Sequence, residues 1–429
     1  MLTTTRLISA VNKCFALLIF IVSINSLSLL LFSAFLVYFI LAFSERIDIL
    51  FTILFFHINY TFSFLILHIS PENYMFSSVA AMGNNLFLVY FYLTIILLFI
   101  ILCLYLVPVR GVFNYPQLSK IFKVLKITIV LNSIPSIFGL YGVGRMVASA
   151  FIGYFIRIFL ILQILLPLLF TPSFSKWRYF YLSLIAIAGF ISGSRAFIFI
   201  ILLNLFYYGL IHNVKINFKA FILGILLIGV SVYFYPIISA NRLGQEFTYS
   251  GPIGTSTLET ILSVRQRFGG VDIANGLYNS GFKFPWYQLY GEMGITLNKY
   301  FPGDFLPLPP NFYPSEYISA KLLSDYDFLH YIKDEFRYTE SMRLGRFFLI
   351  GPLSIIFLFL TFLFSLYIQN NSKEVNYIIR FNIIYNMLLA GSYSETFYIT
   401  LDMVFLNIIL MIAFKFQSYS SDQRLQFNH

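Results

Sequence analysis

The chain has 429 residues, of which 59% are apolar, 20% aromatic and only 11% charged, and its formal net charge is +10. Soluble domains carry about 25% charged residues, so this composition excludes an ordinary soluble globular protein. Runs of about 20 apolar residues cross a bilayer as helices, whereas the strands of a membrane barrel alternate polar and apolar residues. We therefore predict an all-α polytopic membrane protein.

Successive apolar segments indicate the membrane spans. From residue 47 onward they lie near 47–69, 84–107, 121–141, 147–170, 177–193, 196–212, 219–239, 346–368, 377–391 and 396–416. The first apolar stretch, 14–43, would reach roughly 45 Å as one helix, which exceeds a hydrocarbon core of about 30 Å. Ser23, Asn25 and Ser26 interrupt it. A hairpin here gives twelve spans and one long tilted helix gives eleven.

Loop charge predicts the orientation. Lys and Arg occur in 108–120 and the turn after it, in 171–178, 213–219 and 369–380, and in the C-terminal tail. These segments share one side if the spans alternate, and the positive-inside rule makes that side the cytoplasm. The opposite, external side then holds 70–83, 142–146, 194–195, 241–345 and 392–395. We favour twelve spans, because the hairpin also places Arg6 and Lys13 in the cytoplasm.

The large polar loop divides the chain into 1–240, 241–345 and 346–429, with spans in the first and last parts. The loop contains 11 of the 18 Asp and Glu residues and nine of the 28 Lys and Arg residues. Its Trp286 and many Tyr, Phe and Leu residues favour a folded element over disorder. We expect a short helix at 256–268, ended by Gly269 and Gly270, and a longer helix at 315–347.

The turn Gly193-Ser194-Arg195 joins two predicted spans on the external face. An Arg fixed on a short hairpin suits phosphate oxygens, because its planar guanidinium donates hydrogen bonds in a fork. The alternative is an interfacial Arg that reaches toward lipid headgroups.

Further arginines lie in the large loop. Arg265 and Arg267 stand beside Gly269 and Gly270, and guanidinium groups with free glycine amides can cradle a diphosphate. The other loop arginines are Arg242, Arg337 and Arg343. The alternative is a solvated charged face that pairs with the acids of the loop.

The segment from His330 to Arg343 contains candidate bases. Glu340 or His330, near an external membrane surface, could deprotonate a hydroxyl group. The alternative is a set of ion pairs between residues three and four apart on a solvated helix.

Two charges fall within predicted spans, Arg157 and Asp402. Intramembrane charges are functional candidates by default, and these two could pair or line the path of a lipid-linked substrate. Cys14 and Cys103 form no metal-binding spacing, and no nucleotide-binding motif occurs, so we expect no metal and no cofactor. The positive charge follows the loops and needs no nucleic-acid partner.

The layout resembles the O-antigen polymerase (Wzy-type) family. The resemblance rests on the span number, the large external loop before the last spans, Ser192-Gly193-Ser194-Arg195 at a span junction, and Thr339–Leu344 leading into Phe347–Pro352. Arg265 and Gly276 also fit the R-x10-G spacing of some members, but Arg145 is followed by Ile156 where a second glycine would stand.

This resemblance implies a membrane-embedded fold of the glycosyltransferase C class in the bacterial inner membrane, with the large loop in the periplasm. The implied reaction joins oligosaccharide repeat units. Donor and acceptor are both linked to undecaprenyl diphosphate, a lipid of the membrane. A chain-length regulator is the expected partner. Arg195 and Arg265 would hold the diphosphate, with Arg242, Arg267 and Arg343 secondary. Glu340 is the first candidate base and His330 the second, and Trp286 and Tyr290 could stack on sugars.

Two other functions stay open. An O-antigen ligase shares this layout and is expected to use a loop histidine, here His330. A lipid-linked oligosaccharide flippase is a transporter, for which internal repeats would be expected, and no clear repeat relates the two halves.

Overall fold

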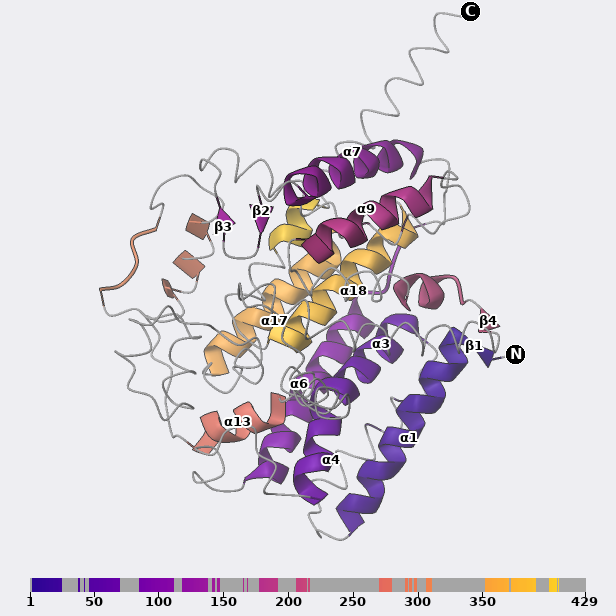
Figure 1. Cartoon of the computed structure of the whole chain (residues 1–429). Coiled ribbons are helices and arrows are strands. Elements are labelled where there is room, and N and C mark those ends of the chain that lie inside the picture. Colours follow the sequence, from indigo (N-terminus) through magenta and orange to yellow (C-terminus); the bar gives the residue numbers. More distant parts are fainter. Residues whose placement is uncertain are drawn as a thin grey trace, which may run out of the picture.

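The computed structural model is helical apart from two short two-stranded ladders (Figure 1). It describes residues 2–24, 38, 42, 46–69, 85–111, 118–137, 141–142, 145–146, 165, 168, 177–191, 206–213, 215–216, 270–279, 290–291, 293–294, 297–298, 306–310, 352–369, 372–390, 401–406 and 408. The all-α class predicted from composition is therefore confirmed for this part of the chain.

The chain begins with a strand, β1 (Leu2–Thr3), that pairs antiparallel with β4 (Lys215–Ile216). Helix α1 (Thr4–Ile24) follows at once. It therefore starts ten residues before residue 14, where the apolar stretch suggested a start. The early turns are helical because Ile8 and Asn12 are buried against the protein while Arg6 and Lys13 point outward. A search for continuous apolar runs misses such a turn.

The segment predicted at 47–69 is one continuous helix built in three parts. These are α3 (Ile47–Phe56), the π-helical turn η1 (His57–Thr61) and α4 (Phe62–Ile69). In the turn, the backbone N–H of Phe62 donates to the carbonyl of His57, five residues earlier. Such π-turns accommodate one extra residue in an α-helix and often mark functional positions.

Helix α6 (Leu86–Leu106) matches the segment predicted at 84–107. Within the described residues, three helical stretches are long and apolar enough to cross a membrane: Thr4–Val22, Ile47–His68 and Leu86–Leu106. Large apolar side chains on their outer faces are exposed, including Leu17, Phe99 and Leu102. The chain is a membrane protein.

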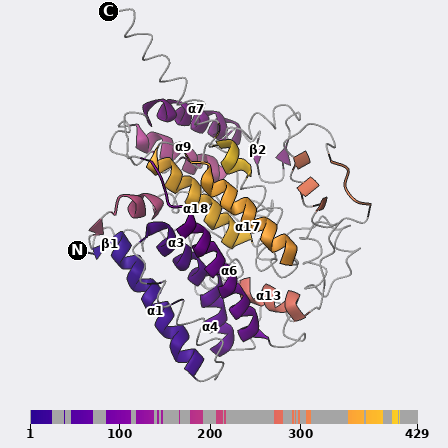
Figure 2. The same cartoon turned by 180° about the vertical axis from the view of Figure 1, so that it is seen from behind.

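Helices α7 (Leu118–Ile137) and α9 (Arg178–Ile191) pack side by side and lie together in both views (Figures 1 and 2). A tight hairpin of β2 (Tyr141–Gly142) and β3 (Arg145–Met146) follows α7. The segment predicted as a span to residue 141 therefore ends its helix earlier, because Tyr141 belongs to the hairpin. The span predicted at 177–193 is helical over α9.

The C-terminal part contributes α17 (Pro352–Tyr367) and α18 (Lys373–Ala390). Helix α18 begins four residues before the predicted start at 377. The hydroxyl of Ser372 accepts a hydrogen bond of 3.4 Å from the N–H of Val375, and a serine in this place satisfies a free donor of the first turn. The polar first turn, Lys373-Glu374, is therefore helical although it is not apolar.

One helix of the large loop is described, α13 (Gly270–Asn279). Gly270 is the first residue of α13; the helix expected at 256–268, which Gly269 and Gly270 would end, lies outside the described residues. Small residues are compatible with a helix start as well as an end.

Other predicted spans are described only in short pieces. Residues 206–211 and 401–406 are helical, within the segments predicted at 196–212 and 396–416. The segments predicted at 147–170 and 219–239 fall almost wholly outside the described residues, as do the expected helices at 256–268 and 315–347.

Helix α3 forms the centre of the packed core. The Phe51 ring lies 4.8 Å from Phe381 of α18 and 5.3 Å from Tyr207, measured between ring centroids. Helix α3 also contacts α1 and α6. All three of these rings are fully buried, so aromatic packing joins segments that are far apart in the sequence.

The bundle has two distinct ends. Helices α1 and α3 run parallel, since Asn12 donates to the Leu50 carbonyl at 3.1 Å and the next turns bring the Phe15 and His57 rings to 4.6 Å. The N-terminus, β4 and the start of α3 thus share what we call the basic end. Gln369 and Asn376 bond the backbone at Pro108 and Arg110, which adds the ends of α6 and α17 and the start of α18.

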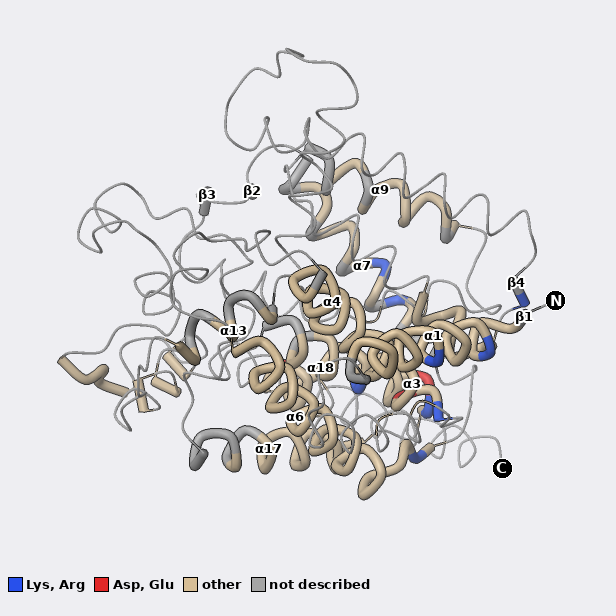
Figure 3. Tube along the Cα trace, turned by 90° about the horizontal axis from the view of Figure 1, so that it is seen from below, with Lys and Arg blue, Asp and Glu red and all other residues tan. Residues whose placement is uncertain are grey.

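The opposite end holds the start of α6, the end of α4 and α13, and we call it the α13 end. In Figure 3 the Lys and Arg positions drawn in blue lie in the half of the view that carries the N-terminus, whereas β3, which contains Arg145, lies in the other half. The blue positions lie on the same side as α1 and β4, which belong to the basic end.

Candidate functional site

A buried ion cluster joins three helices at the basic end. The Arg46 guanidinium donates to both oxygens of the Asp48 carboxylate, at 3.2 and 2.7 Å, and Arg380 donates to it at 2.9 Å. Asp48 belongs to the first turn of α3 and Arg380 to α18. Arg46 also donates to the Leu104 carbonyl at the end of α6, at 2.8 Å, and its guanidinium lies 5.1 Å from the Tyr105 ring.

The cluster is enclosed by protein. The Asp48 and Arg380 side chains are 2% and 3% exposed, whereas Arg46 is 30% exposed. Burying a charge costs several kcal/mol unless a partner and further hydrogen bonds compensate it. Here Asp48 also accepts the N–H of Ile49 at 3.1 Å. The carboxylate is therefore the shared acceptor that keeps α3 and α18 together.

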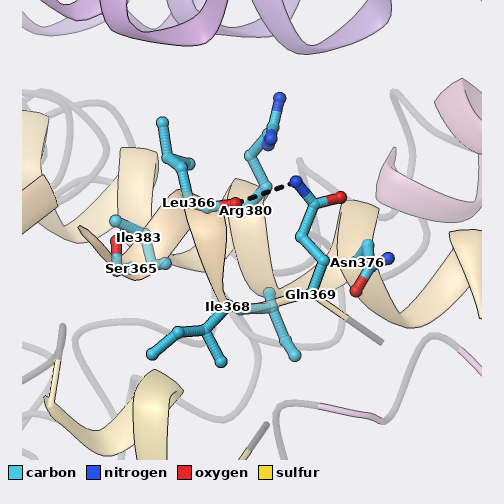
Figure 4. Close-up of a pocket in the computed structure, with 8 residues that line it drawn as sticks. Ser365, Leu366, Ile368, Gln369, Asn376, Arg380 and Ile383 are labelled. Carbon is cyan, nitrogen blue, oxygen red and sulfur yellow. Dashed lines mark hydrogen bonds between the residues drawn. The ribbon is translucent and has the colours of Figure 1, made fainter. Parts of the chain in front are cut away.

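Beside this cluster, α17 and α18 form a small pocket that opens to solvent (Figure 4). Gln369 reaches across it and donates to the Leu366 carbonyl at 2.9 Å. Its lining residues are Ser365, Leu366, Ile368, Gln369, Asn376, Ile379, Arg380 and Ile383. The pocket lies at the basic end and includes none of the site residues predicted from the sequence.

A second polar group is buried within the bundle, around the π-turn η1. The Tyr38 hydroxyl lies 2.6 Å from His57 Nε2, and His57 Nδ1 lies 3.1 Å from the Thr61 hydroxyl. Thr61 in turn lies 2.9 Å from the Tyr90 hydroxyl of α6. All four side chains are at most 3% exposed. The π-turn thus places two polar side chains of one helix in a continuous hydrogen-bonded chain.

A third contact brings the large polar loop onto the bundle. Helix α13 contacts α4, η1 and α6, and its inward face is fully buried at Val271, Ala274 and Asn275. The Asn275 side-chain oxygen accepts the backbone N–H of Asn85, the residue before α6, at 3.1 Å. The same oxygen accepts the amide of Asn279 at 3.2 Å, and Asn85 donates to Asn279. This amide cluster holds α13 at the α13 end.

The residues predicted for diphosphate binding and for base catalysis lie outside the described residues, so the structure does not test them. They are Arg157, Arg195, Arg242, Arg265, Arg267, His330, Arg337, Glu340 and Arg343, and the possible sugar-stacking Trp286 also lies outside. Tyr290 is 40% exposed and Asp402 is buried. Gly276 lies within α13.

Sequence reasoning missed both buried polar groups. Arg380 was counted as a loop charge, and Asp48 and Tyr38 were not singled out. The sequence did contain a signal for the ion cluster. Asp48 stands at the start of the predicted span 47–69 and Arg380 near the start of 377–391, and both starts are predicted at the cytoplasmic side of the membrane. No such signal relates Tyr38 to His57 and Thr61.

Within the described residues, no group of His, Cys, Asp and Glu side chains is arranged to hold a metal ion. Comparison with known proteins gives no match to a family, to a curated protein or to a solved structure.

Proposed function

We propose that this protein polymerises oligosaccharide repeat units carried on a polyprenyl diphosphate, such as undecaprenyl diphosphate, by glycosyl transfer at the external face of the bacterial inner membrane. One observation carries the proposal: α13, a helix of the large polar loop, is docked on the end of an apolar bundle opposite the basic end. The loop is thus attached where a lipid-linked sugar would present its diphosphate.

The positive-inside rule assigns the basic end to the cytoplasm, and α13 then faces the periplasm. The N-terminus shares the basic end with the start of α3. A single crossing between residues 14 and 43 would put these two points at opposite ends, so the arrangement supports the twelve-span interpretation. A glycosyltransferase C-like fold is part of the same proposal.

Chain continuity supports a role for two candidate arginines at this face. Arg267 is three residues before Gly270, where α13 begins, and three residues of chain span at most about 11 Å. Arg265 is two residues earlier in the sequence. A guanidinium group here can stabilise the negative charge that develops on a diphosphate leaving group, because a fixed donor needs no reorganisation.

In the proposed reaction, the bond between the anomeric carbon of the growing chain and its diphosphate oxygen breaks. A new bond forms between that carbon and a hydroxyl oxygen of the incoming unit. The hydroxyl proton passes to a base, Glu340 first and His330 second, and the lipid diphosphate leaves. Arg195 and Arg265 hold the diphosphate, with Arg242, Arg267 and Arg343 as secondary contacts, and no cofactor takes part.

The experiment is the surface lipopolysaccharide profile of a strain that lacks the gene. Single-repeat bands are expected. Complete loss of repeats would overturn the proposal in favour of a ligase or a flippase. A normal ladder would exclude the polymerase, the ligase and the flippase alike.

Arginine variants test the assigned roles. In a complemented strain, Arg195→Ala and Arg265→Ala are each expected to keep normal expression and to abolish the ladder. A normal ladder in both variants would overturn the arginine assignment. If His330→Ala abolishes transfer while Glu340→Ala does not, the ligase becomes the better interpretation.

A further inference from the structure

The face of α13 that packs on the bundle contains two apolar residues and a buried asparagine. Val271, Ala274 and Asn275 are three and four residues apart, so they lie on one face of the helix, and all three are fully buried. Asn279 continues this face by one turn. An amide at a fully buried position requires partners, and its partners here belong partly to another element.

The geometry makes Asn275 the centre of the contact. Its single side-chain oxygen accepts two hydrogen bonds, from the Asn85 backbone N–H at 3.1 Å and from the Asn279 amide at 3.2 Å. The first bond crosses from the large loop to the membrane bundle, 190 residues apart in the sequence. Because Asn85 immediately precedes α6, its N–H has no place in the regular hydrogen-bond ladder of that helix, and the Asn275 oxygen satisfies it.

We propose that Asn275 is a positioning residue, whose side-chain oxygen holds α13 on the start of α6 and so fixes the large loop against the membrane bundle during repeat-unit transfer. The proposal rests on the proposed function for its consequence, but the contact itself can be measured without any activity. A loop held this way keeps charged groups at a defined distance from a lipid-linked substrate, and a displacement of about 1 Å can cost a hundredfold in rate.

Cross-linking tests the contact. The parent protein carries Cys14→Ser and Cys103→Ala. Asn85→Cys and Asn279→Cys then put two thiols in place of two side chains that are hydrogen-bonded to each other. The bond from the Asn85 N–H to Asn275 survives these changes, because it uses the backbone of Asn85. We expect an oxidant to form the disulfide readily in membranes. Adding Asn275→Ala should lower the rate about tenfold, because it leaves a donor without its acceptor.

Asn298 offers a matched control. It belongs to the same loop, and within the described residues its side chain bonds locally, at 2.9 and 2.8 Å to the backbone of Leu306. Asn298→Ala should therefore leave the cross-linking rate between positions 85 and 279 unchanged. An equal rate in the Asn275→Ala protein and its parent would overturn the proposal, as would an equal fall with Asn298→Ala.

The disulfide also provides a rescue. Asn275→Ala in the double-cysteine chain should shorten the polysaccharide ladder under reducing conditions, and oxidation should restore its length, because the covalent bond replaces the lost contact. A ladder that stays short after the disulfide has formed would overturn the positioning role. If the cross-linking results hold but the deletion strain keeps a normal ladder, the contact is supported and the proposed polymerase function fails.

Discussion

Arg380 and Asp48 form a buried ion pair of 2.9 Å between residues 332 positions apart in the sequence. The pair fixes α18 to the first turn of α3. Near the C-terminal end of α18, the Tyr60 hydroxyl donates to the Leu388 carbonyl at 2.6 Å. Helix α18 is therefore attached near its middle and near its C-terminal end to the same continuous helix, with Phe381 packed between.

The ion cluster predicts an order of stability losses. Asp48→Ala should destabilise the protein most, by about 3–5 kcal/mol, because it leaves Arg380 buried without a carboxylate. Arg380→Ala should cost less, since Arg46 still pairs with Asp48. Arg46→Ala should cost least, because the Arg46 side chain is partly exposed. Thermal unfolding of the purified protein in detergent measures all three.

The control for this series is Arg110→Ala, because the Arg110 side chain is exposed and Arg110 bonds Gln369 and Asn376 through its backbone, which the substitution keeps. It should leave the unfolding temperature within error of the parent. The double variant Asp48→Ala, Arg380→Ala should cost less than the sum of the two single changes. Additive losses would contradict a direct interaction.

Tyr60→Phe isolates the second attachment of α18. It removes one hydroxyl and keeps the buried ring, so the expected loss of unfolding free energy is about 1 kcal/mol. Tyr367→Phe serves as its control, because Tyr367 lies on α17 and is 62% exposed. Urea or thermal unfolding compares the two variants, and equal effects would argue against the Tyr60 contact.

His57→Phe tests the polar chain at the π-turn. The phenylalanine ring can keep the stack on Phe15, but it leaves the Tyr38 hydroxyl without the imidazole, and the expected loss is about 1–3 kcal/mol. His68→Phe is the matched control: His68 also contacts two rings, Phe64 and Phe87, and is only partly buried. Its effect should stay within about 0.5 kcal/mol. If His57→Phe leaves the unfolding free energy unchanged, the hydrogen bonds among Tyr38, His57 and Thr61 do not stabilise the fold.

The two ends of the bundle can be assigned by labelling single cysteines in a chain without Cys14 and Cys103. With an impermeant maleimide on intact spheroplasts, Tyr290→Cys should react, since this loop residue is 40% exposed. Lys215→Cys and Arg6→Cys, at the exposed start of α1, should react only after permeabilisation. Labelling of Arg6→Cys from outside would reject the twelve-span interpretation, and labelling of Lys215→Cys from outside would reverse the whole orientation.

The sequence predicted the helices that are apolar along their whole length. The segments 47–69 and 84–107 match α3–η1–α4 and α6 closely, because burial in lipid requires unbroken apolar runs. The sequence-based prediction failed where a helix begins with polar residues. Thr4–Lys13 and Lys373–Asn376 are helical because a buried face or a serine cap stabilises them, and neither feature raises the apolar content.

Side-chain partners were less predictable than helices. The orientation drawn from Lys and Arg in the loops agrees with the grouping of Lys215, Lys373 and Arg110 at the basic end. The pairing of Asp48 with Arg380 could not be read from one sequence, because it depends on which helices are neighbours. The π-turn was missed for another reason: His57, Asn59 and Thr61 are polar, but composition alone does not distinguish a π-turn from the α-helix that continues on both sides of it.

The position of Arg46, two residues before Asp48, bears on the order in which the chain is made. Synthesis adds roughly 5–20 residues per second, so roughly 20–60 s separate Asp48 from Arg380 at their spacing of 332 residues. During that interval the carboxylate already has a cation beside it on the nascent chain. Arg46 is thus the cation available to Asp48 from the start of synthesis, and Arg380 joins the same carboxylate only after the rest of the chain has been translated.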